Sequence, residues 1–349
     1  MQAELVKSLA RECGFELVGV APVGPQPDFG RFQAWTERGF AGEMRYLTDR
    51  RADLRADACS LLPNAQSVIC VGKLYNQPEP EHANPDALLS RYALSRDYHD
   101  VLRERLQLLC NKLLALELFE YKICVDTAPL LERSYARQAG LGWIGRNTCL
   151  INEPLGSWFF LGEIVTTLAL QPDSPPPDRC GTCSRCIDAC PTAALIPSQS
   201  GEWTLDARRC IAYLNIELRG PIPEELRSGL GPHIFGCDIC QDVCPWNSRA
   251  PFTDDAALAP LLGAVPDLLP IATLAKEDFK PFYGSTPVYR AKYEGFLRNA
   301  AIAMGNSGDE RYRESLEGLA SHASELVREH ALWALARLSQ GKPEPAVCE

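Results

Sequence analysis

The sequence lacks any long apolar run, and this absence excludes a membrane-spanning helix, which needs about 20 consecutive apolar residues. Residues 1–22, MQAELVKSLARECGFELVGVAP, also lack the basic segment and apolar stretch that together mark a secretory signal, and they contain no twin arginine. We therefore expect a cytoplasmic protein with reduced thiols and no membrane partner.

Positive charge is scarce as well. The chain has 35 Lys and Arg residues against 45 Asp and Glu residues, a formal net charge of -10, which argues against a protein that coats nucleic acid with its whole surface. A local basic groove is compatible with this balance, because Arg290, Lys292 and Arg298 lie close together in YRAKYEGFLRN among aromatic residues that can stack on bases. The alternative is a solvated helix face carrying a few arginines, which charge alone favours.

Cysteine, by contrast, is abundant, and eight of the 15 cysteines belong to one arrangement, in which seven form two spaced runs. The first run reads CxxCxxCxxxC before Pro191, the bacterial ferredoxin spacing in which the fourth cysteine ligates the other cluster. The second reads CxxCxxxCP, and one further cysteine lies between the runs. The spacing predicts two 4Fe-4S clusters, one held by Cys180, Cys183, Cys186 and Cys244, the other by Cys190, Cys210, Cys237 and Cys240.

Two other uses of these cysteines were weighed. CxxC pairs also bind zinc, but a zinc site closes with four ligands and gains nothing from the third cysteine of the run or the proline after the fourth. A disulfide framework belongs to short secreted chains. The isolated cysteines are interpreted as small buried apolar residues. Another role stays open for Cys149 because of the motif that it follows. The isolated cysteines are Cys13, Cys59, Cys70, Cys110, Cys124, Cys149 and Cys348.

Ahead of the cysteine runs, helical and strand patterns alternate and predict an α/β layered domain. Beyond a proline-rich linker at 171–178 and the cluster module, a pattern at Leu297-Arg298 and Ala301-Ile302 is echoed at 327–332, which is typical of HEAT-like helical hairpins, although two unrelated amphipathic helices would also fit. Strands are expected at Leu17–Ala21, Ser67–Val71, Tyr121–Val125 and Ser157–Thr167, and helices at Glu4–Cys13 and Val101–Leu118.

Asp126 ends one of these expected strands, where α/β proteins place ligand-binding groups. The alternative is that Asp126 caps the helix that follows it. Further on, the segment 140–148 has three glycines in six residues and permits close backbone approach to a bulky ligand. It does not open a helix directly after the first strand, as a dinucleotide fingerprint would.

Several motifs together resemble the epoxyqueuosine reductase family over nearly the whole chain. They are FAGEMRYL at Phe40–Leu47, RDYH at Arg96–His99, DTAPLLER at Asp126–Arg133, GWIGRNTCLI at Gly142–Ile151, RRCIAYLNIE at Arg208–Glu217, CQDVCPWN at Cys240–Asn247 and the doubled cysteine runs. The resemblance implies an α/β (α+β) cobalamin-binding core like that of reductive dehalogenases at 1–170, a ferredoxin-like module with two 4Fe-4S clusters at 171–250, and a HEAT-like helical region contacting tRNA at 251–349.

The same resemblance implies the reaction and its residues. The family reduces the epoxide of epoxyqueuosine in tRNA to the cyclopentene, with base-off cobalamin and Asp126 as the proton donor, protonated because burial raises its pKa. Tyr92 departs from members that have a small residue or cysteine nearby. The corrinoid contacts carried over are Arg55, Tyr92, Asp126, Asn147, Gly156 and Ala212, and the tRNA contacts are Arg290, Lys292, Arg298 and Asn299.

The partners expected are tRNA carrying epoxyqueuosine and a low-potential electron donor, and we expect a monomer. Two other functions share some of these features. A corrinoid-dependent reductive dehalogenase also uses two clusters but typically carries an export signal, and a plain iron-sulfur electron-transfer protein needs neither Asp126 nor the glycine-rich segment.

Overall fold

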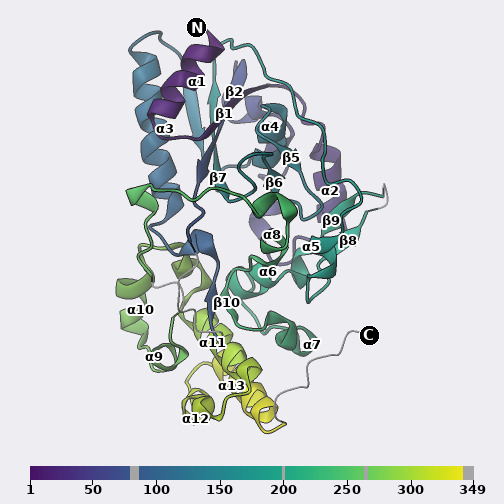
Figure 1. Ribbon diagram of the computed structural model, residues 1–349, viewed down its shortest axis with the longest axis vertical. Helices are drawn as coiled ribbons and strands as arrows, with labels where there is room; N and C mark the ends of the chain where they lie inside the picture. Colours follow the sequence, from purple (N-terminus) through teal and green to yellow (C-terminus); the bar gives the residue numbers. More distant parts are fainter. Residues whose placement is uncertain (79–85, 199–200, 263–265, 341–349) are drawn as a thin grey trace.

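The computed structural model describes residues 1–78, 86–198, 201–262 and 266–340. Figure 1 shows an elongated molecule, with a sheet and its helices at the N-terminal end, the cysteine-rich segment in the middle and a group of helices at the far end. Cys348 lies outside the described residues. Within these ranges, no helix combines the length and the apolarity that a bilayer crossing requires.

The N-terminal sheet has four strands in the order β1-β2-β7-β4, and every neighbouring pair is antiparallel. The four apolar runs that the sequence predicted as strands are these four strands, and the central strand β2 is buried along its whole length. Because the sheet is antiparallel, the rule for strand ends in parallel α/β sheets does not apply to Asp126. The strands are β1 (Leu17–Pro22), β2 (Ser67–Leu74), β4 (Tyr121–Cys124) and β7 (Phe159–Thr166).

Helices cover both faces of this sheet (Figure 1). The expected helices near residues 4–13 and 101–118 are confirmed as α1 and α3, which share one apolar core with the sheet, while α4 packs on the opposite face. The helices of this part are α1 (Ala3–Glu12), α2 (Phe29–Glu37), α3 (Tyr98–Leu114) and α4 (Glu132–Gln138). A small hairpin follows α4 and consists of β5 (Trp143–Ile144) and β6 (Leu150–Ile151).

The cysteine-rich segment is built from short helices and strands that alternate with loops. A strand of this segment, β10, pairs in parallel with β3 of the N-terminal part, which ties the two parts together. Strand β3 spans Leu88–Leu89. The elements of the cysteine-rich segment are α5 (Arg185–Asp188), β8 (Leu195–Pro197), β9 (Trp203–Leu205), α6 (Ile211–Ile216), α7 (Glu224–Arg227), β10 (His233–Phe235) and α8 (Ile239–Asp242).

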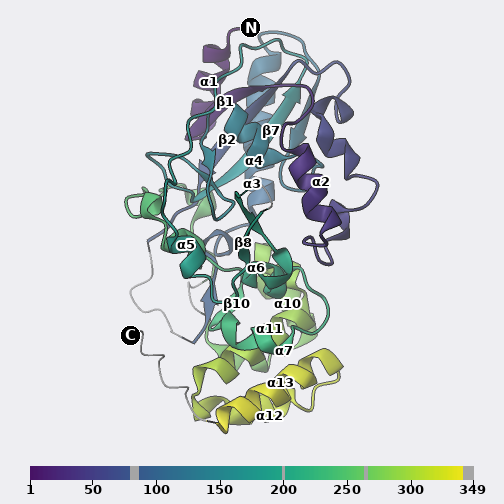
Figure 2. The same cartoon turned by 90° about the vertical axis from the view of Figure 1, so that its right-hand side faces the viewer.

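The C-terminal helices pack around α11, whose residues 295–305 are all buried. The two halves of the self-similar pattern lie on α11 and α13, which pack against each other (Figure 2). Arg298 of the first half is buried and Arg328 of the second is only partly buried, so the halves are not equivalent, and a HEAT-like repeat stays a prediction. The helices are α9 (Leu268–Ala272), α10 (Lys276–Tyr283), α11 (Tyr293–Ser307), α12 (Arg313–Leu319) and α13 (Glu325–Leu338).

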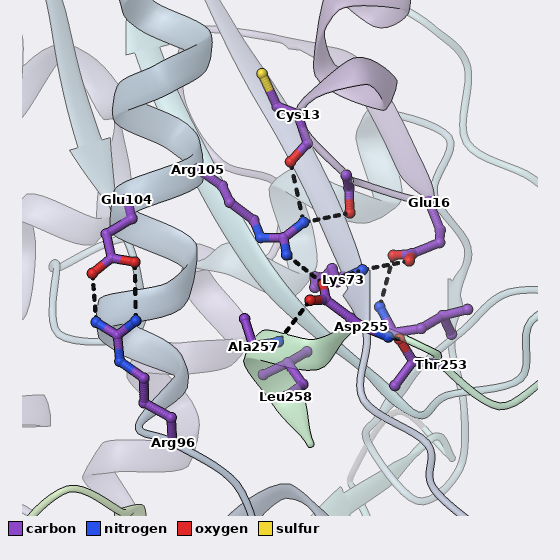
Figure 3. Close-up of polar contacts among 12 residues, drawn as sticks. Cys13, Glu16, Lys73, Arg96, Glu104, Arg105, Thr253, Asp255, Ala257 and Leu258 are labelled. Carbon is purple, nitrogen blue, oxygen red and sulfur yellow. Dashed lines mark hydrogen bonds and ion pairs between the residues drawn. The ribbon is translucent and has the colours of Figure 1, made fainter.

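The segment after residue 250 returns to the N-terminal part before it enters the C-terminal helices. Asp255 pairs there with Lys73 of β2, at 2.8 Å between Oδ2 and Nζ, and with Arg105 of α3 (Figure 3). Lys73 also pairs with Glu16, and its side chain is only 4% exposed. The expected division at 170 and 250 stays a prediction, and this ion-pair network joins two of its parts.

Candidate functional site

The seven cysteines of the two runs, together with Cys210, line two cavities. The first thiol cavity has a volume of about 250 Å³, and the second thiol cavity has about 330 Å³. Their cysteine linings divide as the ferredoxin cross-over rule predicts. The first contains Cys180, Cys183, Cys186 and Cys244, and the second contains Cys190, Cys210, Cys237 and Cys240.

The size of these cavities bears on which metal group the cysteines suit. In a zinc site four thiolates stand about 2.3 Å from one ion. Over the ranges that the structure describes, no three His, Cys, Asp or Glu side chains converge closely enough to hold a single metal ion. Each set of four thiols instead surrounds a cavity, which favours a larger inorganic cluster. The ligation itself stays a prediction.

Asn147 and Cys149 connect the two thiol cavities to the glycine-rich segment. Asn147 lines both cavities, is 5% exposed, donates from Nδ2 to the Cys240 carbonyl at 3.2 Å and accepts the Cys149 amide. The Cys149 thiol lines the second thiol cavity and is hydrogen-bonded to the Cys240 thiol. Cys149 is therefore an exception among the isolated cysteines. The interpretation as buried apolar residues is confirmed for Cys13, Cys70, Cys110 and Cys124, while Cys59 is half-buried.

A third and larger cavity, of about 850 Å³, lies beside the second thiol cavity and is called the large cavity below. Arg133, Thr148, Cys210 and Ala212 line both of them, so a group in the large cavity would stand next to the second set of cysteines. Asp126 also lines the large cavity, with 49% of its side chain exposed there.

Asp126 lies in the turn between β4 and α4, residues 125–131, which is called the Asp126 turn below. Its backbone φ is +52°, a left-handed conformation that non-glycine residues rarely adopt. Its carboxylate lies 3.3 Å from Nε2 of His99, and Nδ1 of His99 lies 2.7 Å from a carboxylate oxygen of Asp97. The result is a chain of three ionisable groups that ends at the cavity.

The contacts among these three groups determine which of them carries a proton. Burial by itself lowers the pKa of His99, but the hydrogen bonds to Asp126 and Asp97 outweigh it and raise the pKa to about 9. Burial likewise raises the pKa of Asp126, yet the hydrogen bond and charge of His99 outweigh it, so the net shift is downward. At neutral pH, His99 is protonated and Asp126 is ionised.

One expectation for Asp126 is wrong and another stays a prediction. The alternative that Asp126 caps the next helix fails, because the capping residue of α4 is Leu131 and the Asp126 carboxylate bonds to His99 instead. A protonated carboxyl was expected from burial against a corrin face; in the protein alone the imidazolium of His99 lowers the pKa of Asp126, and the effect of a corrin face stays a prediction.

The other expected corrinoid contacts divide into two groups. Arg55 and Ala212 line the large cavity, and Asn147 lines the adjoining second thiol cavity. Arg55 is 6% exposed and donates to the carbonyls of Arg51 and Tyr46.

Tyr92 and Gly156 lie outside the lining of these cavities. Tyr92 packs between Tyr98 and Phe235. Gly156 lies so close to Asn247 that a Cβ there would collide with the amide oxygen. Both residues make packing contacts in the protein alone, and their expected corrinoid contacts stay predictions.

The expected tRNA contacts divide in the same way. Arg290 is bonded to Glu217 and lies over the ring of Tyr46, two residues that line the large cavity, and Lys292 is exposed. Arg298 and Asn299 are each 1% exposed and bond to main-chain carbonyls of other elements. These two cannot reach a phosphate, so their expected role is corrected to a structural one.

The glycine-rich segment also serves packing. A Cβ at Gly142 would collide with the carbonyl of Ile151 on the paired strand β6, so the close backbone approach is to the protein's own hairpin. The segment contributes to the cavities through Asn147, Thr148 and Cys149.

Sequence reasoning did not assign roles to His99, Asp97 or Glu132. The first two belong to the RDYH motif and the third to DTAPLLER, so both motifs were visible. What the sequence did not show is that His99 reaches Asp126 across 27 positions of the chain.

Comparison with known families gives two matches. Residues 55–127 match a family model described as epoxyqueuosine reductase QueG. Residues 179–247 match a model described as a 4Fe-4S double cluster binding domain. The first range contains Asp126, and the second contains the seven cysteines of the two runs and Cys210.

Individual relatives cover nearly the whole chain. An epoxyqueuosine reductase of Xanthomonas campestris is 42% identical, with 96% of each chain covered. A crystal structure of epoxyqueuosine reductase with an epoxyqueuosine-modified tRNA-Tyr stem loop is 28% identical, covers 96% of this chain and 89% of that one, and has a TM-score of 0.88. The Bacillus subtilis enzyme, solved with its aspartate-bearing catalytic loop swung out of the active site, is 27% identical, with coverage of 96% and 90% and a TM-score of 0.86.

Proposed function

The chain belongs to the epoxyqueuosine reductase family, and on this premise we propose that it reduces the epoxide of epoxyqueuosine in tRNA to the cyclopentene of queuosine. Removing the epoxide oxygen as water consumes two electrons and two protons. The observation that carries the proposal is that Asp126, paired with His99, faces a large cavity adjoining the second set of cysteines. Electrons and protons would thus reach one cavity from different residues of its lining.

Two 4Fe-4S clusters are the proposed electron carriers. We propose that each occupies one thiol cavity and that a low-potential donor reduces them from outside. Residues shared by the second thiol cavity and the large cavity support electron delivery to a group bound in the latter. This arrangement suits a cytoplasmic enzyme, because thiols stay reduced in that compartment.

Cobalamin is the cofactor that we propose for the large cavity. The volume of about 850 Å³ falls in the range of cofactor sites, roughly 300–1,000 Å³. Arg55, Ala212 and Asn147 are the residues that would hold the group. When bound, a base-off corrinoid would supply a cobalt centre that passes electrons to the epoxide carbon.

Asp126 and His99 form the proposed proton-delivery unit. His99 holds the proton at neutral pH and Asp126 presents a carboxylate to the cavity, so a proton can pass through Asp126 to the departing oxygen. Asp97 orients the imidazole and stabilises its positive charge. We propose that the Asp126 turn corresponds to the catalytic loop of the Bacillus subtilis relative.

tRNA is the proposed substrate carrier. Arg290, which lies over Tyr46 of the large cavity, and the exposed Lys292 are the residues that we propose to contact its phosphates. Specific RNA recognition targets unpaired loops whose bases can be splayed out. An anticodon loop with its modified base inserted in the cavity would meet this requirement.

An anaerobic assay tests the proposal. Protein reconstituted with iron, sulfide and cobalamin is mixed with epoxyqueuosine tRNA and a chemical reductant, and nucleosides are analysed by mass spectrometry. We expect loss of one oxygen atom from the modified nucleoside. Fully loaded protein that leaves the epoxide intact would contradict the proposal, and failure to retain cobalamin through desalting would favour a plain electron-transfer protein.

A further inference from the structure

Two carboxyl side chains behind Asp126 are not used by the reaction described above. Glu163 lies in the middle of β7, is 0% exposed, and neither of its carboxyl oxygens accepts a hydrogen bond from a donor in the part of the chain that the structure describes. Its carboxyl contacts that of Glu132, the first residue of α4. Two acceptor-only groups in contact are stable only if a proton lies between them.

The positive charge of Arg133 favours ionisation of Glu132, but it does not outweigh burial and the charge of Asp126. The residues paired with Glu163 across the sheet are Cys70 and Cys124, whose thiols point to main-chain carbonyls. The guanidinium of Arg133 bonds to Thr148, and Asp126 adds a further negative charge. Burial and then the charge of Asp126 raise the pKa of Glu132 to about 8. Burial and then the charge of Glu132 also raise the pKa of Glu163 well above its ordinary value.

Glu132 also reaches Asp126 directly. Its carboxylate accepts the backbone N–H of Asp126, the residue with the left-handed φ of +52°. This conformation is unfavourable for a residue other than glycine, so it persists only where contacts hold it. The bond from Glu132 is such a contact, and it ties the Asp126 turn to the rigid α4 and the sheet.

We propose that Glu132 and Glu163 share one proton and serve as a positioning pair that holds the Asp126 turn in the large cavity. The inference rests on the proposed function, because it assigns the pair to the placement of the proton-delivering carboxylate. With the proton shared, Glu132 stays beneath Asp126 and accepts its amide. Without it, two adjacent carboxylates repel each other and Asp126, and the turn leaves its position.

The isosteric variant Glu163→Gln tests the shared proton. Its amide donates permanently to Glu132, so the contact survives while the titration disappears. In wild-type enzyme, kcat should decline as pH rises through about 8, when the pair ionises. In the variant the decline should begin near pH 9, where His99 loses its proton. Glu120→Gln, a substitution at an exposed position, is the control and should keep the wild-type profile.

Glu132 variants test the link to Asp126. Glu132→Ala should lower kcat at least tenfold, because the Asp126 carboxylate is then misplaced. The KM for tRNA should change less than threefold, because the residues proposed to contact tRNA are unchanged. Glu132→Gln can still accept the Asp126 amide and should restore kcat to within threefold of wild type. Equal losses in the Ala and Gln variants would overturn the positioning role.

A measurement without turnover separates this inference from the proposed function. Infrared spectra at neutral pH should contain a C=O stretch of a protonated carboxyl that is absent from Glu163→Gln. The variant should also melt at the same or a higher temperature than wild type at pH 8–9, because raised carboxyl pKa values in the folded chain make stability fall as pH rises from the ordinary value through about 8. A missing band, or an unchanged alkaline profile, would refute the shared proton even if wild-type enzyme reduces epoxyqueuosine.

Discussion

In the proposed reaction, Asp126 and His99 would divide between them the tasks of holding and presenting a proton. A lone carboxyl in an apolar site must keep its own proton, which requires a raised pKa. Here the imidazole stores it, since its pKa is raised to about 9, and the carboxylate presents a negative oxygen to the cavity. The pair can therefore deliver a proton at neutral pH although the Asp126 carboxyl is ionised.

The substitution Asp126→Asn tests this division. Asparagine keeps the size of the side chain but cannot relay a proton, so turnover of epoxyqueuosine tRNA should fall by about a hundredfold or more. Iron, sulfide and cobalamin contents should be unchanged. Single-turnover kinetics measure the loss, with Asp100→Asn, an exposed position on α3, as the control. A near-wild-type rate would leave Asp126 without a catalytic role.

Burial likewise separates the basic residues near α11 into two kinds. Arg298 donates to the carbonyls of Leu214, Leu218 and Gly220, which fixes the cluster module to this helix. Lys292 is exposed and has no such task. Both residues looked alike as members of one basic motif.

Arg298→Met and Lys292→Ala should therefore have opposite effects. Loss of charged hydrogen bonds to buried carbonyls in Arg298→Met should lower the free energy of unfolding by about 3 kcal/mol, with little change in tRNA affinity of the folded fraction. Lys292→Ala should weaken tRNA binding and reduce the slope of log K against log salt by about one. Denaturation and salt-dependent binding measure the two effects. An unchanged salt slope in Lys292→Ala would place the phosphate contacts elsewhere.

At the scale of elements, the end of α5 explains how one cysteine run serves two cavities. The chain turns directly after this short helix, with a left-handed residue at Ala193, and the Ala194 amide donates to the Cys190 sulfur. Cys190 thereby enters the second thiol cavity, while Cys186 on the helix lines the first. The turn separates the fourth cysteine from the other three.

Cys190→Ala should therefore damage the second cluster more than the first. Wild-type protein should hold about eight iron atoms per chain and the variant about four, with one cluster signal left in spectroscopy. Cys183→Ala should remove the other signal. Cys149→Ser is the matched control, since Cys149 lines the same cavity outside the predicted ligand set. Loss of the same cluster in Cys190→Ala and Cys183→Ala would contradict the cross-over assignment.

At the scale of the whole molecule, the segment after residue 250 fastens the C-terminal helices to the N-terminal sheet. The side chain of Asp255 forms ion pairs with Lys73 and Arg105 (Figure 3). Asp255 is 10% exposed, and the side chain of Lys73 is almost completely buried. Burial raises the pKa of Asp255, but the hydrogen bond and charge of Lys73 outweigh it and lower the pKa overall. Its stabilising contribution is present above the ordinary value of 3.8 and is lost as pH falls through the lower folded value.

Asp255→Ala should lower the free energy of unfolding by about 2–3 kcal/mol, because a buried ammonium loses one of its two partners. The loss should shrink in acid, where wild-type Asp255 is itself protonated. Chemical denaturation at two pH values measures both effects, and exposed Asp254→Ala is the control. An equal cost in the two variants would show that the ion-pair network does not fasten the parts.

The sequence by itself determined the features that depend on neighbouring residues. Four apolar runs predicted the four sheet strands because a buried strand needs a continuous apolar stretch, and thiol spacing predicted two sets of cluster ligands because chelation needs ligands at fixed short intervals. The motifs around Asp126 identified the family for the same reason, since each is contiguous.

Only the tertiary structure decided the features that depend on residues far apart in the chain. The antiparallel sheet, the His99 contact that lowers the pKa of Asp126, and the burial of Arg298 and Asn299 all arise from distant partners. The residues that pack against a side chain determine its charge state and its exposure. The sequence does not show which distant residues these are. The Glu132 and Glu163 pair is the clearest case, because its two carboxyls meet only when α4 folds onto the sheet.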